Sequence, residues 1–180
     1  MAVASGTPRT LIEGDTSRKP TYSASMVAVS VAALASDIMT LTGGTGALVK
    51  VVRVVVSGIA TAAGAFDVLL VKRSAANSGG TAALLDIVPR DSNSATPAAI
   101  ARSYTANPTV GTGLGTVAAA RITVTTAAGA IGNAPQAFEL LGPQSQPVAL
   151  RGSGEVLALN LNATTITGGS ITAYVEWTEE

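Results

Sequence analysis

The sequence predicts an all-β fold, an antiparallel β-sandwich that is most specifically a jelly roll with an extended N-terminal arm. Apolar residues alternate with period two in short runs separated by Gly, Asn, Pro and Ser, and no long segment has the helical period. Hydrophobic residues make up 47% of the chain but aromatics only 3%, so the core is built mainly from Ala, Val, Leu and Ile. An immunoglobulin-like sandwich is the alternative, but its Cys–Trp–Cys pattern is absent.

The C-terminal third shows the alternation most strongly. A strand is predicted over residues 148–151, and two longer ones over Glu155–Asn162 and Ser170–Thr178. One face of the first of these two strands carries Leu157, Leu159 and Leu161, and one face of the second carries Ile171, Ala173, Val175 and Trp177. The last strand holds the only tryptophan of the chain, so we expect it to lie inside a sheet with Trp177 as a core or interface anchor.

Four strands are predicted in the N-terminal half, over residues 26–33, 37–41, 47–57 and 64–73. The third is the strongest, with Val49, Val51, Arg53 and Val55 on one face and mainly valine on the other. A strand that is apolar on both faces is expected to be central and covered on both sides. Residues 64–73, with Phe66, Val68 and Leu70 on one face, are expected to be its hairpin partner.

The middle of the chain, residues 74–116, is rich in loop-forming residues. Ala83–Val88 and Ala98–Tyr104 are predicted as short strands at a sheet edge or as a long excursion between sheets. Ala98–Arg102 could equally form one helical turn. Strands are expected again over 117–125 and 136–141, with an Ala/Gly-rich loop at 126–135.

Two parts are predicted, an extended arm at residues 1–22 and a single sandwich domain at 23–180. We expect the arm to dock on a neighbouring subunit, although a disordered tail is the alternative. A signal peptide is the alternative for Arg18 to Ala35, but Val27, Val29 and Val31 alternate as in a strand. No apolar run approaches the roughly 18 residues that a membrane span needs, so no membrane contact is expected.

The charge balance argues for contact with proteins rather than with nucleic acid. Eleven basic and 11 acidic residues give a net charge of zero, which offers no electrostatic footprint for nucleic acid. Charged residues are only 12% of the chain and the mean hydropathy is +0.43. We therefore expect much of the surface to be buried against copies of the chain or a larger body.

Most catalytic and metal-binding chemistry lacks its residues here. There is no Cys and no His, which removes disulfides, thiolate zinc sites and histidine-based triads. The glycines of residues 43–46 and 111–115 lack a phosphate-loop lysine and are predicted as hairpin turns. Asp91–Ser94 could ligate calcium with Asp86, but an Asx-type turn is favoured. A glycosidase carboxylate pair is also disfavoured, so we predict no enzyme, no cofactor and no metal site.

Four cations, Lys50, Arg53, Lys72 and Arg73, lie on the two strands predicted at 47–57 and 64–73. They could form cross-strand pairs, for example with Asp67, or a basic strip facing an acidic partner. The residues alone leave both alternatives open.

Several phrases of the chain carry a resemblance to a known class of protein. They are Val-Lys-Arg-Ser at 71–74, the turn at 91–94, Ser103 to Pro108, Leu150 to Asn162, and the closing segment from Gly168. In these phrases, most of residues 47–180 resembles virion structural proteins of tailed bacteriophages, and jelly-roll decoration or cement proteins are the closest kind. The resemblance implies a trimer on the capsid exterior, where it braces the shell against internal DNA pressure.

From the resemblance we expect a non-enzymatic decoration protein in the virion, made in the host cytoplasm, whose partners are its own copies and the major capsid protein. The interface is expected at Arg9, Leu11, Ile12, Arg18, Lys19, Tyr22, Tyr174 and Trp177. Alternatives are a neck, tail or fibre-base protein contacting the host, an adhesion or carbohydrate-binding module, and a major capsid protein.

Overall fold

The computed structural model describes residues 19–62, 64–124, 135–142 and 146–180. This part contains twelve strands and no helix: β1 (Thr21–Ser30), β2 (Ala35–Thr42), β3 (Leu48–Ile59), β4 (Gly64–Arg73), β5 (Thr81–Leu84), β6 (Ile87–Pro89), β7 (Ile100–Ala106), β8 (Gly113–Val124), β9 (Gln136–Glu139), β10 (Val148–Arg151), β11 (Val156–Thr164) and β12 (Ser170–Glu179). The predicted all-β class is confirmed.

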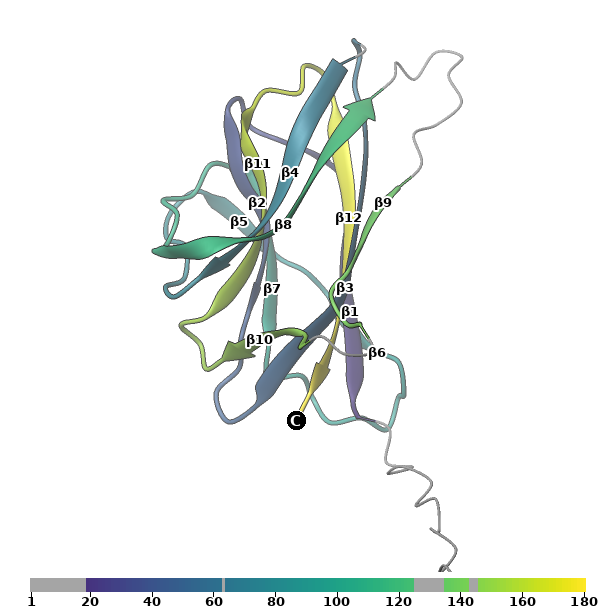
Figure 1. Ribbon diagram of the computed structural model, residues 1–180, viewed down its shortest axis with the longest axis vertical. Coiled ribbons are helices and arrows are strands. Elements are labelled where there is room, and N and C mark those ends of the chain that lie inside the picture. Colours follow the sequence, from purple (N-terminus) through teal and green to yellow (C-terminus); the bar gives the residue numbers. More distant parts are fainter. Residues whose placement is uncertain (1–18, 63, 125–134, 143–145) are drawn as a thin grey trace, which may run out of the picture.

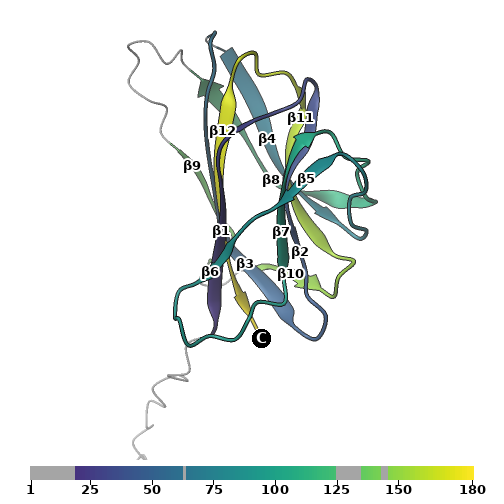
Figure 2. The ribbon, with the colours of Figure 1, turned by 180° about the vertical axis from the view of Figure 1, so that it is seen from behind.

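The strands form two antiparallel sheets packed face to face as a sandwich (Figures 1 and 2). Sheet A has the order β10-β3-β12-β1-β6, with β9 also paired to β3, and sheet B has the order β5-β7-β2-β11-β4-β8. The first four strands alternate between the sheets, and the first strand pairs with the last. This order is compatible with the expected jelly roll.

The expected hairpin between residues 47–57 and 64–73 is wrong. Strand β3 lies in sheet A between β12 and the β9/β10 edge, whereas β4 lies in sheet B between β11 and β8. The chain crosses from one sheet to the other after Ile59. Both strands carry a strongly apolar face, and facing each other across the sandwich buries both faces at once.

Strand β3 also departs from strict alternation. Its pairing with β12 shifts by one residue between Val51 and Arg53, so Val52 is the extra residue of a bulge. Val49 and Val51 point into the core before the bulge, and Val54 and Val56 do so after it. The expected face of Val49, Val51, Arg53 and Val55 is therefore wrong, because the bulge turns Arg53 out of the core.

The predicted alternation of the C-terminal strands is confirmed, and one set of residues on each strand points into the core. Leu157, Leu159 and Leu161 of β11 are buried, and so are Ile171, Ala173, Val175 and Trp177 of β12. Strand β12 is central in sheet A, between β3 and β1. Phe66, Val68 and Leu70 of β4, which share a face as predicted, are also buried; β4 lies beside β11 in sheet B, so this face is turned toward sheet A.

The middle of the chain supplies edges to both sheets. The expected piece Ala83–Val88 is divided into β5, at the edge of sheet B, and β6, at the edge of sheet A. The alternative helical turn at Ala98–Arg102 is wrong, because β7 begins at Ile100 and pairs with β2 and β5.

Strand β1 begins five residues before the expected Met26. Thr21 and Tyr22 pair with Thr178 and Trp177, so they belong to the sandwich rather than to an arm. The remainder of the expected arm, residues 1–18, and most of the expected loop at 126–135 lie outside the described residues.

Candidate contact surfaces

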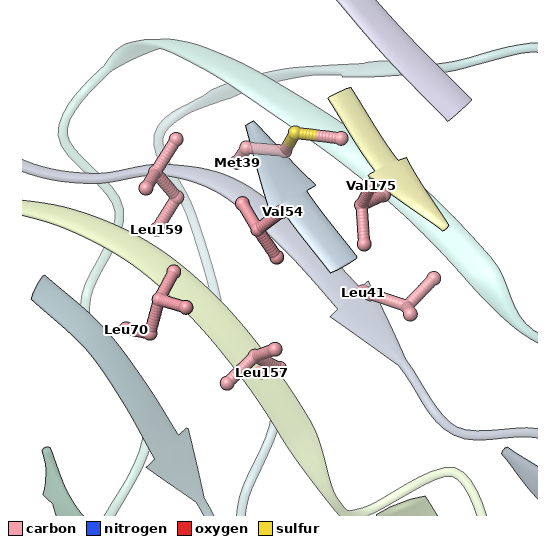
Figure 3. Close-up of a pocket in the computed structure, with 7 residues that line it drawn as sticks. All are labelled: Met39, Leu41, Val54, Leu70, Leu157, Leu159 and Val175. Carbon is pink, nitrogen blue, oxygen red and sulfur yellow. The ribbon is translucent and has the colours of Figure 1, made fainter. Parts of the chain in front are cut away.

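The space between the two sheets is filled by side chains. A hollow of only about 10 Å³ lies between them, lined by aliphatic and Met side chains from both sheets (Figure 3). This is about the space of one water molecule. The lining residues are Met39, Leu41, Val54, Leu70, Leu157, Leu159 and Val175. The sandwich interior therefore has no room for a small-molecule ligand at this place.

The larger hollows lie open on the surface. One of about 540 Å³ lies between Lys19–Thr21 and the loop from Arg90 to Ser94. Within that loop the Asp91 carboxylate accepts the Asn93 N–H at 2.9 Å, which confirms the predicted Asx-type turn. No cluster of three acidic, His or Cys residues that could hold a metal occurs in the described part of the chain. Nor does any described helix have the length and apolarity to span a membrane.

Almost every described cation is neutralised by a carboxylate of the same chain. Seven of the nine described Lys and Arg residues form ion pairs: Lys19 and Lys50 with Glu180, Arg53 with Glu139, Lys72 with Glu155, Arg73 with Asp37, Arg90 with Glu176 and Arg121 with Asp67. Lys50, Arg53, Lys72 and Arg73 are thus all paired, though none with Asp67. Since β3 and β4 belong to different sheets, these cations form no single basic strip.

The surroundings of three charged groups shift their pKa values. The pKa of Glu155 is lowered, first by the backbone N–H of Arg151 and then by Lys72, although burial opposes the shift. The pKa of Lys50 is lowered by burial and by the neighbouring Lys19 and Arg151. The pKa of Arg90 is raised by its hydrogen bond to the Tyr174 hydroxyl and by Glu176. None of these three groups lies in an enclosed pocket where it could act as a general acid or base.

The outer face of sheet A is broad, and its charged side chains are paired within the chain. Its outward residues on the three long strands are Thr21, Ser23 and Ser25 of β1, Thr172, Tyr174, Glu176 and Thr178 of β12, and Lys50, Arg53, Val55 and Ser57 of β3. Tyr174 lies near its centre, where its hydroxyl lies 3.2 Å from a Glu176 carboxylate oxygen. Because Lys50, Arg53 and Glu176 are each paired within the chain, the face is close to neutral.

The residues predicted as interface are divided by the structure. Tyr22 and Trp177 are 1% and 0% exposed and stack with ring centroids 6.0 Å apart, so they build the core and cannot contact a partner directly. That part of the interface prediction is corrected. Tyr174 lies half-buried on the outer face of sheet A, and Lys19 is exposed beside Glu180. Arg9, Leu11, Ile12 and Arg18 lie outside the described residues.

Two buried polar clusters were not predicted. The Asp37 carboxylate accepts two hydrogen bonds from Arg73, both 2.7 Å, and others from Asn77 and Asn160. The Glu179 carboxylate accepts the indole N–H of Trp177 at 2.9 Å and the backbone N–H groups of residues 98 and 99. A charged residue at an inward strand position, such as Glu179 after Trp177, is the signal that could have indicated the second.

Comparisons with known proteins add no relative to this picture. No family model, no curated protein and no solved structure matches the chain. Its function must therefore be argued from its own residues and surfaces.

Proposed function

We propose that the chain is a non-enzymatic capsid decoration, or cement, protein of a tailed bacteriophage. It binds in many copies to the outside of the capsid and stabilises the shell. Its partners are further copies of itself, as a trimer, and the major capsid protein. It is made in the host cytoplasm and resides on the capsid exterior.

The observation that carries the proposal is the neutral outer face of sheet A on a sandwich with a filled interior. Charges on this face are satisfied within the chain, as in the Arg90–Glu176 pair at 2.6 Å. Small polar and apolar side chains such as Ser25, Val55 and Thr172 can be buried against a protein surface at little desolvation cost. Many identical weak contacts on a symmetric shell add through avidity.

The phage setting is supported by the resemblance of residues 47–180 to virion proteins and by a strand order compatible with a jelly roll. The described ion pairs leave no strongly basic surface for nucleic acid. A sugar-binding site generally needs exposed aromatic rings, and two of the chain's aromatics, Tyr22 and Trp177, are buried. The surface is therefore better suited to protein contact than to carbohydrate.

Copy number in purified virions tests the proposal directly. Quantitative mass spectrometry should give a ratio near one to one with the major capsid protein. A few copies per hundred capsid subunits would instead support a neck, tail or fibre-base protein. Absence from particles would refute a virion role.

A charge placed on the outer face of sheet A tests which surface binds. Ser25 is exposed and lies opposite Tyr174, so Ser25→Arg leaves the core intact. We expect it to weaken binding to undecorated capsids about tenfold, or about 1.4 kcal/mol, because the added charge must be desolvated.

The matched control is Thr123→Arg on β8, which adds the same charge at an exposed position of sheet B. It should bind capsids as the unmodified protein does. Equal binding by both variants would exclude the outer face of sheet A as the contact surface.

A further inference from the structure

A hollow of about 330 Å³ lies open on sheet A where two strands share one edge of β3. β10 pairs with β3 at residues 48–51 and β9 pairs with it at residues 53–56, so Val52 lies in the gap between them. The hollow has a mainly aliphatic wall and two lysines at its rim. Its lining residues, which we call the lysine hollow, are Lys19, Lys50, Val52, Leu141, Pro147, Thr178 and Glu180.

The two ammonium groups of the lysine hollow share one side-chain carboxylate. Lys19 binds one carboxylate oxygen of Glu180, and Lys50 binds the other at 2.6 Å. Each ammonium group has three N–H donors, so both can donate to a further carboxylate. Burial and the neighbouring charge of Lys19 lower the pKa of Lys50, and a second negative charge would offset that repulsion. The hollow is therefore suited to a carboxylate that carries aliphatic side chains beside it.

The chain carries such a group in residues 84–88, which lead from sheet B to the β6 edge of sheet A. Leu85 and Ile87 pack against the core, whereas the alternate residues Leu84, Asp86 and Val88 are exposed. Leu84 is 71% exposed and Val88 is 59% exposed. Among the carboxylates of the described residues, Asp86 alone has neither an ion pair nor a hydrogen bond.

The hollow and this segment cannot meet within one chain. β12 and β1 lie between β3 and β6 in sheet A, so the two surfaces are on opposite sides of the sheet. We infer that residues 84–88 of one copy dock in the lysine hollow of a neighbouring copy. The Asp86 carboxylate binds the two ammonium groups, and the exposed aliphatic side chains beside it pack on the wall that contains Leu141.

This contact joins two different surfaces of the chain, so it repeats from copy to copy and closes into a ring when the rotation permits. A trimer about a three-fold axis is such a ring. The inference rests on the proposed function for the number of copies, whereas the pairing of the two surfaces follows from their charge and their apolar side chains.

Sedimentation velocity of the purified full-length protein, over a range of concentrations, tests the contact without any capsid. Asp86→Arg should weaken self-association at least about tenfold, because it brings a third cation to the hollow. Lys50→Glu should weaken it similarly, because the hollow then holds two carboxylates. The double variant should recover self-association, since its arginine meets those two carboxylates. Asp67→Arg, the same exchange at an exposed ion pair of sheet B, is the matched control and should associate normally.

A protein that stays monomeric, association that neither single variant changes, or a double variant that fails to recover would each overturn the contact. Fluorescence of the buried Trp177 shows whether each variant is folded, and Asp86→Asn, which removes only the charge, should weaken association in the same direction. Copy number in virions is measured separately, so loss of this contact and failure of the proposed virion role are distinguished.

Discussion

At the scale of single residues, the described part of the chain buries one ion pair, Asp37 with Arg73. Asp37 and Arg73 are 1% and 6% exposed, and the guanidinium donates to both carboxylate oxygens. Arg73 also donates to the Gly111 carbonyl, and the Asn77 side chain bonds both Asp37 and the Gly111 N–H. This cluster ties the segment after β4 and the segment before β8 to the outer face of sheet B.

Removing one partner of this pair should destabilise the fold strongly. Asp37→Ala leaves the Arg73 charge buried without a counter-charge, and we expect a loss of about 3–5 kcal/mol in the free energy of unfolding by urea denaturation. The control is Asp67→Ala, which breaks the exposed pair with Arg121 and should lose about 0–1 kcal/mol. Similar losses in the two variants would contradict a special role for the buried pair.

Tyr22 makes stability depend on alkaline pH. Its pKa is raised by burial and by the Glu179 carboxylate, so the folded state favours the neutral phenol. A raised folded-state pKa gives stability that is complete below the unfolded value of about 10 and is lost as pH rises through the folded value.

Tyr22→Phe should remove this alkaline loss. The variant keeps the ring but loses the hydrogen bond to the Ala95 carbonyl, which lowers stability at pH 8 by about 0.5–1.5 kcal/mol. Urea denaturation at pH 8 and above pH 10 should show a smaller drop for the variant than for the unmodified protein. Equal drops would show that other groups control the alkaline transition.

At the scale of elements, the segment before β8 packs so closely on the segment after β4 that residue 111 has no room for a side chain. A Cβ atom at Gly111 would lie 1.9 Å from the Ala75 carbonyl oxygen, whereas one at Gly64, at the start of β4, would meet nothing within 4 Å. We expect Gly111→Ala to lose about 1–3 kcal/mol through overpacking. Gly64→Ala should be neutral or gain about 0.4–1 kcal/mol. Thermal unfolding of the two variants separates these outcomes.

The strands and their faces could be predicted from the sequence where the alternation is regular. The neighbouring strand with which each one pairs could not be predicted. β11 and β12 keep period two over their inward residues, so their faces were predictable. In β3 the bulge at Val52 shifts the faces, and a run of valines gives no signal of where the extra residue lies. Sheet membership of β3 and β4 depends on contacts far apart in the chain, which local patterns do not contain.

The candidate surfaces were less predictable than the fold. Trp177 is equally suited to a core or an interface, and only its place opposite Tyr22 and beside Glu179 decides for the core. Ion pairs such as Lys72 with Glu155 join residues that are far apart in sequence, so the pattern of the sequence does not show them.

At the scale of the whole molecule, the sandwich is closed by its first and last strands. β1 pairs with β12 over most of its length, and the Glu179 N–H donates to the Pro20 carbonyl. Leu48 and Glu180 exchange backbone hydrogen bonds in both directions. Residues 19–22 are therefore part of the body of the protein, although the sequence predicts an arm that extends to residue 22.

This closure predicts how much of the expected arm can be removed without loss of stability. Deleting residues 1–18 should leave the thermal midpoint within a few degrees, because β1 and its pairing with β12 remain. Deleting residues 1–22 should lower stability by about 3–5 kcal/mol, the loss typical of removing a large buried aromatic side chain. The additional loss arises at Tyr22, which stacks on Trp177 and pairs with Pro89 of β6. Circular dichroism melts of the two truncations would measure the difference, and equal midpoints would show that the body of the protein begins after Tyr22.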